Sequence, residues 1–528
     1  MEAISKKRLI FIGLTVFFLL WGSAYSTTAA SAGRPDLVVA VQKNPPVLEP
    51  MRENSNVHSR LVYCIADTLI KIDYKNNLQL IPGLAEEWKR IDNRTIEFSL
   101  RKGVKFHNGE ELTAEDVAFS IGPERLFHKE RGWTFAQMYL GQIEPPEVID
   151  RYTVRISSKK PDPLLEKRFA SYMSEIVSKR AFLAAKDWDT WSRAVVASGP
   201  YKIVEIKTDD YIKLEAFDDY WGGRPPAKTI TFKVVPEVAA RIAGLRTGEY
   251  HIATEIPPDQ VESIDKDENC ATIGGPIPSI RSVNFDETND VLKNPDLRRA
   301  MAMAVDRQLI VDTLYHGRTT VPSGFQMKLF GDMCIKNFKA TPYDPEKARE
   351  LIKKSGYNGE TIYYRILPDY YTLEVATAQI LAEMWKSVGL NVKIEMKENW
   401  SQILKNDETR HLFNLSNTAY YYDPVGQMWR RLGPQCWVRH EDKYGGKAPV
   451  YLFDQQFDNW GKILETETDL GKRREAFNQM LNYLEIKDPA QINLHAMCMF
   501  YGKRNEVDWT PYPSEVMDFS ANNLSFRQ

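Results

Sequence analysis

Hydrophobic positions follow two spacings along this chain, and the spacings predict strands and helices in turn. Residues 37–41 (LVVAV) form a short apolar run that is typical of a buried strand, and residues 95–100 alternate in the manner of a strand. From residue 57 to residue 69, apolar side chains recur at helical spacing. Residues 70–74 and 78–81 flank turn-forming residues, which predicts a hairpin.

The second half of the sequence repeats this alternation. Residues 280–285 (IRSVNF) predict a strand that crosses between lobes, and residues 392–396 predict a further short strand. Helical patterns cover residues 296–314, 344–355 and 374–388. Because short strands alternate with helices, the sequence predicts an α/β fold.

Local signals mark several helix ends. Thr113, followed three residues later by Asp116, resembles a capping box, although Glu or Gln is usual at the last position. Asp344 precedes a proline at the start of one predicted helix, and Gly356 follows its last residue. These signals predict a helix start near residue 114 and a helix that ends at residue 355.

The N-terminal segment has the order of a secretory signal peptide. Lys6-Lys7-Arg8 precedes the apolar run of residues 9–22, and Ala30-Ser31-Ala32 forms an A-x-A cleavage site. The run is short for a membrane span, which needs about 20 apolar residues. We therefore expect a mature chain that begins at Gly33 and works outside the cytosol, with an uncleaved anchor helix as the alternative. No cysteine lies near the cleavage site, so a lipid anchor is not expected.

Composition and charge limit the class of protein. Hydrophobic residues make up 43% and charged residues 27%, as in ordinary globular proteins. The formal net charge is −2, and removal of Glu2, Lys6, Lys7 and Arg8, which together carry +2, leaves −4. This value predicts no nucleic acid partner and no polybasic membrane patch. The five cysteines form no C-x-x-C pair, and an exported chain permits one or two disulfides of undetermined pairing.

Catalytic signatures are absent from the sequence. It has no G-x-S-x-G, H-E-x-x-H, Walker A or G-x-G-x-x-G motif, and none of its eight histidines forms an i, i+4 pair. We therefore predict a protein that is not an enzyme and that has no metal site and no cofactor. A secreted hydrolase stays open as the alternative of a different class, because 71 acidic residues offer many carboxylate pairs.

Six ordered blocks of sequence resemble one known family. They are residues 81–88 (IPGLAEEW), 98–107 (FSLRKGVKFH), 112–120 (LTAEDVAFS), 198–201 (SGPY), 298–307 (RRAMAMAVDR) and 343–348 (YDPEKA). Together these blocks resemble the oligopeptide, nickel and opine class of ABC-transporter solute-binding proteins, family 5, and the resemblance covers nearly the whole mature chain.

The resemblance implies an architecture and a role. The expected fold is α/β, the two-lobed periplasmic binding protein fold (type II, class C) with an extra subdomain in lobe I. The lobe I core is expected at residues 33–70, 197–280 and 498–528, the extra subdomain at 71–196, and lobe II at 281–497. One small ligand lies between the lobes, which close on it. The expected partner is the permease of an ABC importer in the inner membrane, and the receptor itself is expected to be a monomer in the periplasm.

The ligand is suggested by departures from the family. Peptide-binding relatives hold the ligand's amino group with an Asp in a W-x-x-D segment that precedes an acidic-Pro pair. In this chain the Trp position is Asn417, the Asp position is Tyr420, and the acidic-Pro pair begins at Asp423. An Arg anchor is also missing near residues 368–369. The departures favour a polar solute such as an opine, a sugar-phosphate conjugate like agrocinopine, or a sugar, with a dipeptide or oligopeptide as the alternative.

Ten residues are candidates for ligand contact. They are Glu53, Asn54, Ser55, Arg281, Asn417, Tyr420, Tyr421, Tyr422, Asp423 and Trp437. Consecutive side chains of an extended segment face opposite ways, so Tyr420 and Tyr422 are expected to share a face while Tyr421 points elsewhere. Phenols stack on flat ligand faces and donate hydrogen bonds. Alternative roles stay open: an aromatic strand in the core, an ordinary polar loop at 53–56, and a solvated Arg281.

Overall fold

The computed structural model describes residues 33–53, 55–127, 136–368, 370–439 and 450–527, without the side chain of Trp437. The predicted signal peptide and Asn54 lie outside the described residues. The chain divides into a short N-terminal unit, Met1–Arg34, and a second unit, Pro35–Gln528, which contains every helix and strand of the described part.

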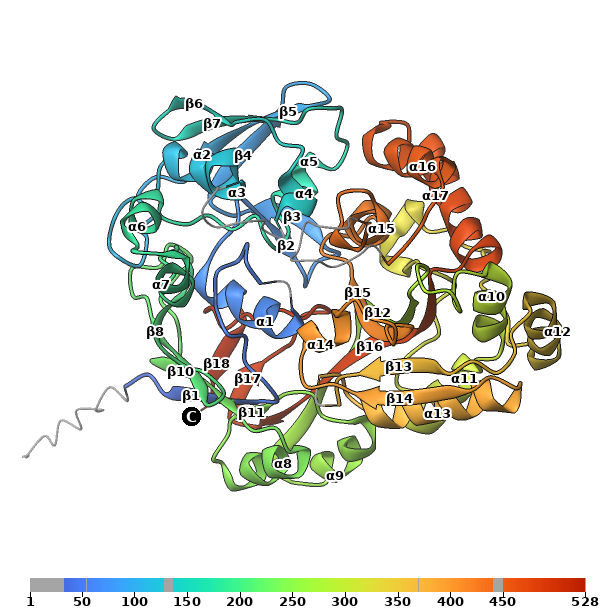
Figure 1. Ribbon diagram of the computed structural model, residues 1–528. Helices are drawn as coiled ribbons and strands as arrows, with labels where there is room; N and C mark the ends of the chain where they lie inside the picture. The colour runs from blue at the N-terminus through green and yellow to red at the C-terminus, as the bar shows by residue number, and fades with distance from the viewer. Residues whose placement is uncertain (1–32, 54, 128–135, 369, 440–449, 528) are drawn as a thin grey trace, which may run out of the picture. The chain divides into compact units, whose positions relative to one another are not determined.

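A mixed central sheet organises the second unit (Figure 1). In spatial order its strands are β14 (Val392–Met396), β13 (Ile362–Ile366), β15 (Leu412–Thr418), β12 (Cys270–Phe285), β16 (Gln491–Arg504), β11 (Ile252–Ala253), β1 (Asp36–Val41), β10 (Thr229–Val234), β9 (Tyr211–Ala216) and β8 (Tyr201–Lys207). β1 is parallel to β10 and β11, and β13 is parallel to β14 and β15. The remaining pairs are antiparallel.

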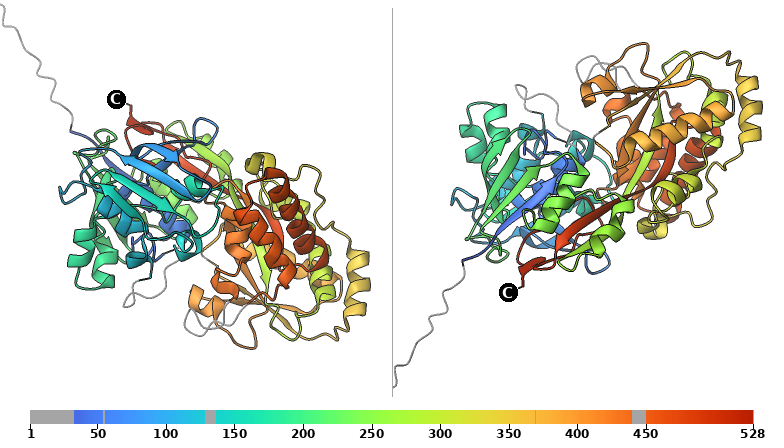
Figure 2. Two further views of the ribbon diagram at one scale, coloured as in Figure 1. Left: turned by 90° about the horizontal axis from the view of Figure 1, so that it is seen from above. Right: turned by 90° about the horizontal axis from the view of Figure 1, so that it is seen from below.

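β12 and β16 are the two long strands at the centre of this sheet. Residues 270–276 of β12 pair with 498–504 of β16, and residues 280–284 pair with 491–496. The ladder shifts register between Pro276 and Ile280 and again between Arg281 and Ser282. β11 pairs with one end of β16, and β15 pairs with the opposite end of β12. Among the described strands, these two therefore join the β8–β11 end of the sheet to the β13–β15 end (Figure 2, β16 in red).

Helices cover both ends of the sheet. The β13–β15 end shares a buried apolar cluster with four helices: α10 (Pro295–Met303), α11 (Arg307–Leu314), α12 (Pro345–Ser355) and α13 (Glu374–Ser387). Trp385 of α13 is fully buried there, and its indole N–H donates to the Met301 carbonyl at 3.0 Å. Near β11, a smaller apolar cluster includes side chains of α8 (Val238–Thr247) and α9 (Val261–Asp265).

A separate antiparallel sheet precedes β8 in the chain. Its order is β4 (Ala85–Arg90), β5 (Thr95–Leu100), β7 (Thr153–Ser157) and β6 (Glu147–Asp150). Two further strand pairs are β2 (Ile70–Asp73) with β3 (Gln79–Pro82) and β17 (Val507–Trp509) with β18 (Leu524–Phe526).

The other α-helices are α1 (Asn56–Ile65), α2 (Ala114–Ile121), α3 (Pro123–Leu126), α4 (Gln137–Leu140), α5 (Leu165–Arg168), α6 (Lys179–Ala184), α7 (Trp188–Arg193), α14 (Trp400–Leu404), α15 (Arg430–Leu432), α16 (Gln455–Thr466) and α17 (Leu470–Asn482). The shorter helical turns are η1 (Pro258–Gln260), η2 (Lys328–Met333), η3 (Val425–Trp429), η4 (Trp437–Arg439) and η5 (Tyr483–Lys487).

The local sequence signals predicted several elements correctly. The hairpin is β2–β3, and the capping box at Thr113 forms as predicted, with the Asp116 carboxylate accepting from the Thr113 backbone N–H at 3.0 Å. Asp344 caps α12, which stops at Gly356 in the left-handed conformation. Strand β14 and helix α13 also lie where they were predicted.

Two helix predictions were wrong in extent. The predicted helix over 296–314 is broken into α10 and α11, because Asp306 turns the chain and accepts from the Leu309 backbone N–H at 2.9 Å as a new N-cap. Helix α1 stops at Ile65 instead of continuing to residue 69. The crossing strand predicted over 280–285 is longer, because β12 begins at Cys270.

None of the possible disulfides forms in the described structure. All five cysteines are free thiols. Cys64, Cys270 and Cys436 are buried, and burial raises the pKa of the Cys498 thiol to about 12. The cysteines therefore contribute as packed side chains and not as cross-links.

The close approach of β12 and β16 predicts that a side chain at Gly274 destabilises the protein. This residue has a φ of +103°, and a Cβ added there would lie 2.1 Å from the Met499 carbonyl oxygen of β16. Gly359 has a similar φ of +94°, but a Cβ there would meet nothing within 4 Å. We expect Gly359→Ala to cost about 1 kcal/mol from backbone conformation alone. Gly274→Ala should cost at least about 1 kcal/mol more, because the ladder must open.

Thermal unfolding of the two purified variants measures this difference. A larger drop in melting temperature for Gly274→Ala than for Gly359→Ala is the expected result. Equal drops would show that the ladder tolerates a side chain at this point.

Candidate ligand-binding site

The start of α1 lies at the junction of the two ends of the central sheet. Ser55 caps the helix, and its hydroxyl accepts from the His58 backbone N–H at 3.3 Å. The Asn56 side-chain amide donates to the Ser416 hydroxyl of β15 at 3.3 Å, and the Asn56 backbone N–H donates to the Tyr370 hydroxyl at 3.4 Å. This short helix therefore contacts segments that are more than 300 residues away in the sequence.

Three cavities surround α1, and each takes side chains from it. The tyrosine cavity, about 60 Å³, includes Ser59 and Tyr63. The arginine cavity, about 30 Å³, includes Asn56 and Val57, and the outer pocket, about 670 Å³, includes Ser55 and Val57. α1 is thus common to all three.

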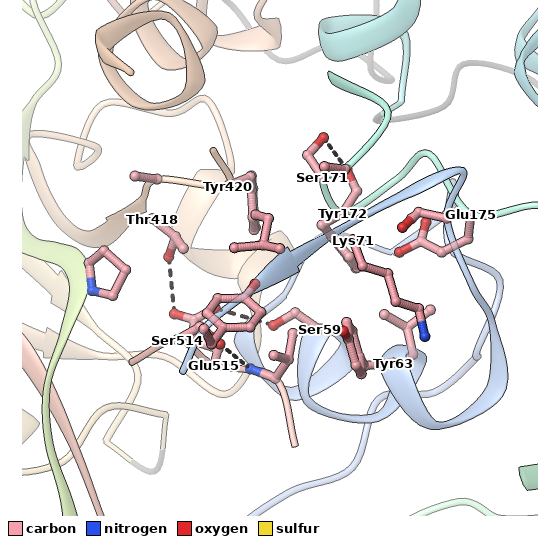
Figure 3. A pocket seen from close by; sticks show the side chains of 18 of the residues that line it. Ser59, Tyr63, Lys71, Ser171, Tyr172, Glu175, Thr418, Tyr420, Ser514 and Glu515 are labelled. Atoms are coloured by element: carbon pink, nitrogen blue, oxygen red, sulfur yellow. Dashed lines mark hydrogen bonds between the residues drawn. The ribbon is translucent and has the colours of Figure 1, made fainter. Parts of the chain in front are cut away.

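The tyrosine cavity is lined by five phenol rings, of which Tyr63, Tyr172 and Tyr420 are labelled in Figure 3. They belong to Tyr63, Tyr74, Tyr172, Tyr420 and Tyr422. The Tyr420 ring centroid lies 5.1 Å from that of Tyr172, and the Arg430 guanidinium lies 4.7 Å from the Tyr420 centroid. Burial raises the pKa of the Tyr420 and Tyr422 phenols above their ordinary value, so both stay neutral at physiological pH. The cavity therefore offers flat apolar faces edged with hydroxyls.

Three acidic side chains line the same cavity, and one of them has a cationic partner. Asp67 pairs with Lys71 at 2.6 Å. Glu515 accepts from the Thr418 hydroxyl at 3.0 Å and from the Ser59 hydroxyl at 3.2 Å. Glu175 is buried, and its Oε2 has no hydrogen-bond partner among the described residues.

Burial sets the protonation of the two other carboxyls. It raises the pKa of Glu515 to about 7, although hydrogen bonds from Thr418 and Ser59 act in the opposite direction. It raises the pKa of Glu175 to about 8. Both groups therefore titrate near neutral pH. Carboxyl groups with such shifted pKa values are concentrated at functional sites.

The arginine cavity centres on Arg281 of β12. Its guanidinium forms an ion pair with Glu374 and lies 3.5 Å from the centroid of the Tyr371 ring. Glu374 also accepts from the Asn414 side-chain amide at 2.7 Å. Arg281 is 3% exposed, and its Nη1 has no partner among the described residues. Glu374 and the Tyr371 ring thus hold the guanidinium in place, and its Nη1 remains able to donate a hydrogen bond.

The outer pocket connects the loop before α1 with α14. Its lining includes Glu53 and Ser55 from the loop before α1, and Tyr370 and Trp400. The Tyr370 and Trp400 ring centroids are 5.0 Å apart. Tyr370 also lines the arginine cavity, so the two spaces share a wall.

Five of the ten predicted site residues line one of the three cavities. Tyr420 and Tyr422 line the tyrosine cavity, Arg281 lines the arginine cavity, and Glu53 and Ser55 line the outer pocket. Asn54 and the side chain of Trp437 lie outside the described residues. The ligand role of each of these residues stays a prediction.

Three further predicted residues lie in packed surroundings outside the three cavities. Tyr421 is 2% exposed, with the Arg168 guanidinium 6.0 Å from its ring centroid, and it does not line the tyrosine cavity with Tyr420 and Tyr422. Asn417 is buried and donates to the Ser282 hydroxyl at 2.7 Å. Asp423 accepts two hydrogen bonds from the Arg473 guanidinium, at 2.8 and 2.9 Å. Its carboxylate is thereby neutralised within the protein.

Sequence reasoning missed several residues of the cavities. Glu515, Glu175 and Tyr172 come from segments without a recognised motif, and Tyr370 and Tyr371 follow a strand, β13, that the sequence did not predict. The consecutive aromatic residues Tyr370 and Tyr371 were the available signal, because ligand pockets are lined mainly by hydrophobic and aromatic side chains. Within the described part, no three potential metal ligands come together. No helix of that part has the length and apolar character needed to cross a membrane.

The buried pair of Asp423 and Arg473 predicts a stability role for Asp423. In Asp423→Ala the Arg473 guanidinium keeps the Leu464 carbonyl but loses its carboxylate. We expect a loss of about 3–5 kcal/mol of unfolding free energy, because an unpaired buried charge remains. Asp290→Ala removes the exposed partner of Lys293 and should leave the melting temperature nearly unchanged. Similar melting temperatures for the two variants would contradict this role.

The raised pKa values of Glu175 and Glu515 predict a pH dependence of stability in the free protein. Between pH 4.5 and about 7 for Glu515, and up to about 8 for Glu175, the folded chain binds more protons than the unfolded chain. Stability should therefore fall as pH rises through this window, by on the order of 1 kcal/mol per pH unit for each group.

Denaturant unfolding between pH 5 and pH 7 tests this slope. Glu515→Gln should flatten it, and the exposed Glu262→Gln on α9 should leave it as in the wild type. An unchanged slope in Glu515→Gln would show that Glu515 does not take up a proton on folding.

Comparisons with known proteins agree with this fold. The model of the family "Bacterial extracellular solute-binding proteins, family 5 Middle" matches residues 79–437. The oligopeptide-binding protein AppA of Bacillus subtilis is 28% identical over 411 residues, which cover 72% of this chain and 73% of AppA.

Solved structures share the fold at lower sequence identity. The periplasmic binding protein DppA of Helicobacter pylori, in complex with the peptide STSA, has a TM-score of 0.83 at 20% identity and covers 93% of this chain and 98% of its own. AgaA of A. tumefaciens R10, in complex with agropinic acid, has a TM-score of 0.78 at 20% identity, covering 93% and 99%. The chain therefore belongs to family 5 of the bacterial extracellular solute-binding proteins and has their two-lobed α/β fold.

Proposed function

We propose that this protein is the periplasmic receptor of an ABC importer and captures one small polar organic solute between its lobes. The observation that supports this most is the position of α1. Its first turns line three cavities together with β15 and the segment around Tyr370, which belong to the other end of the central sheet, and with β12, which reaches both ends. Lobe closure on a ligand requires a space that residues of both lobes line. These cavities take side chains from both ends of the sheet, and β12 and β16 join those ends.

An opine, a sugar-phosphate conjugate or a sugar is the proposed solute class. Neutral phenols and the hydroxyls of Ser59 and Thr418 suit a ligand rich in oxygen and nitrogen. AgaA, which shares the fold, was solved with agropinic acid. A dipeptide or oligopeptide is the second candidate, because AppA is named for oligopeptide binding and DppA was solved with a peptide.

A receptor and a secreted hydrolase differ in one measurable respect. We propose that the protein is exported by its N-terminal signal peptide, binds its solute without altering it, and delivers it to a permease. Native mass spectrometry of the freshly purified protein should detect one retained solute. Addition of that solute to stripped protein should raise stability by RT ln(1 + [L]/Kd), about 2.7 kcal/mol at 100 times Kd, without product. Turnover of the solute would identify a hydrolase instead.

Substitutions in the tyrosine cavity test the proposed location of the solute. Tyr420→Ala and Tyr422→Ala remove ring faces that line the cavity, so affinity should fall by about 10-fold or more. Tyr421→Phe alters a packed ring outside this cavity and should leave affinity unchanged. Calorimetric titration of the retained solute gives the three values. Wild-type affinity in both alanine variants would place the solute elsewhere.

A further inference from the structure

We propose that the solute carries a cationic nitrogen, a protonated amine or guanidinium, and that Glu515 holds this group in the tyrosine cavity. The inference rests on the proposed function and narrows its candidate solutes to an opine or peptide with a cationic nitrogen, which excludes a sugar without one. It depends on three features of the cavity: an acid without a cationic partner, a wall of aromatic faces, and an excess of acidic side chains.

Glu515 is an acid without a cationic partner. It is 3% exposed and accepts hydrogen bonds from two neutral hydroxyls, those of Ser59 and Thr418. Among the described residues, no lysine, arginine or histidine nitrogen lies within 4 Å of its carboxylate. A buried carboxylate in such surroundings is costly when ionised, and a ligand cation removes that cost.

The nearest positive charges are held by other groups. Arg60 donates to Glu255 at 2.5 Å. Arg430 donates to the carbonyl of Thr418 at 3.2 Å and lies over the Tyr420 ring. Both attract the Glu515 carboxylate from a distance, yet burial still raises its pKa to about 7. The protein itself therefore does not complete the charge pair.

The aromatic wall suits a cation as well. Five tyrosine rings line the cavity, and the electron-rich face of such a ring attracts ammonium and guanidinium groups. Lys71, the basic side chain among the lining residues, is paired with Asp67. Glu175 adds a second buried carboxyl on the other side of the cavity in Figure 3, with Oε2 unpartnered in the described structure.

A purely structural role for Glu515 must be separated from ligand contact. Its carboxyl bridges Ser59 of α1 and Thr418 of β15, so it also ties the two ends of the sheet together. Glu515→Gln keeps an oxygen that accepts from a hydroxyl but removes the negative charge. A loss of affinity confined to cationic ligands therefore reports on the charge and not on the bridge.

The experiment uses pairs of probes in which the first carries one or two cationic nitrogens that the second lacks. The pairs are arginine and citrulline, 1,4-diaminobutane and 1,4-butanediol, and Ala-Ala and N-acetyl-Ala-Ala, with sucrose and glucose as neutral sugars. Calorimetric titration is carried out on the full-length mature protein, on Glu515→Gln and on Glu485→Gln. Glu485 is a matched control, because it is buried, accepts from the Asn493 amide at 2.7 Å and lies outside the three cavities.

The expected result is binding of at least one cationic probe about 100-fold tighter than its neutral partner. Glu515→Gln should weaken that binding by about 10- to 100-fold, since a charged hydrogen-bond partner is lost. Glu485→Gln should bind like the wild type. Equal affinity for charged and neutral partners, tight binding of a sugar alone, or wild-type affinity in Glu515→Gln would overturn the inference while leaving the receptor function intact. Failure of every probe, together with no retained solute by mass spectrometry, would count against the proposed function and the inference with it.

Discussion

The hydrogen-bonded ladder between β12 and β16 is the constraint on which the rest of this structure depends. Each strand extends from the β11 end of the sheet to the β15 end, and the ladder shifts register twice along its length. A regular ladder resists bending, whereas a bulge bends and twists the strand pair locally. The chain thus concentrates its irregular backbone where the two ends of the sheet meet, next to Arg281 and the cavities around α1.

Buried charged groups near this junction fall into two groups: those in an ion pair and those without an oppositely charged partner in the described structure. Arg60 with Glu255, Arg281 with Glu374, and Arg473 with Asp423 are ion pairs whose members neutralise each other. Such pairs fix geometry, because breaking one leaves a buried charge unpaired. Glu515 and Glu175 have no such partner in the described structure and respond by holding protons near neutral pH. Ionising these buried carboxyls costs free energy that the fold does not compensate. A ligand with a positive charge can lower that cost.

The fold was predictable where the signals are local, and the site was predictable only in part. The Asp344 cap and Gly356 stop define α12 within a dozen residues, and the resemblance blocks gave the two-lobed architecture. The break between α10 and α11 was missed because apolar spacing continues across Asp306. Tyr420 and Tyr422 were found because they directly precede Asp423-Pro424, the acidic-Pro pair of the family pattern. Glu515 was not found, because it reaches Thr418 across 97 residues and lies in a segment without periodicity. The lobe boundaries stay a prediction.

Under the proposed function, helix α1 links lobe closure to recognition of the solute. Its first turns supply Ser55, Asn56, Val57 and Ser59 to the three cavities, and the same turns hydrogen-bond to Tyr370, Ser416 and, through Glu515, Thr418. Each of these contacts joins the helix to a segment distant in sequence. If the ends of the sheet separate, these hydrogen bonds are lost together and the carboxyl of Glu515 gains access to water, where it ionises more readily. A cation that enters with the solute would meet an ionised acid, and closure would then bury the pair together.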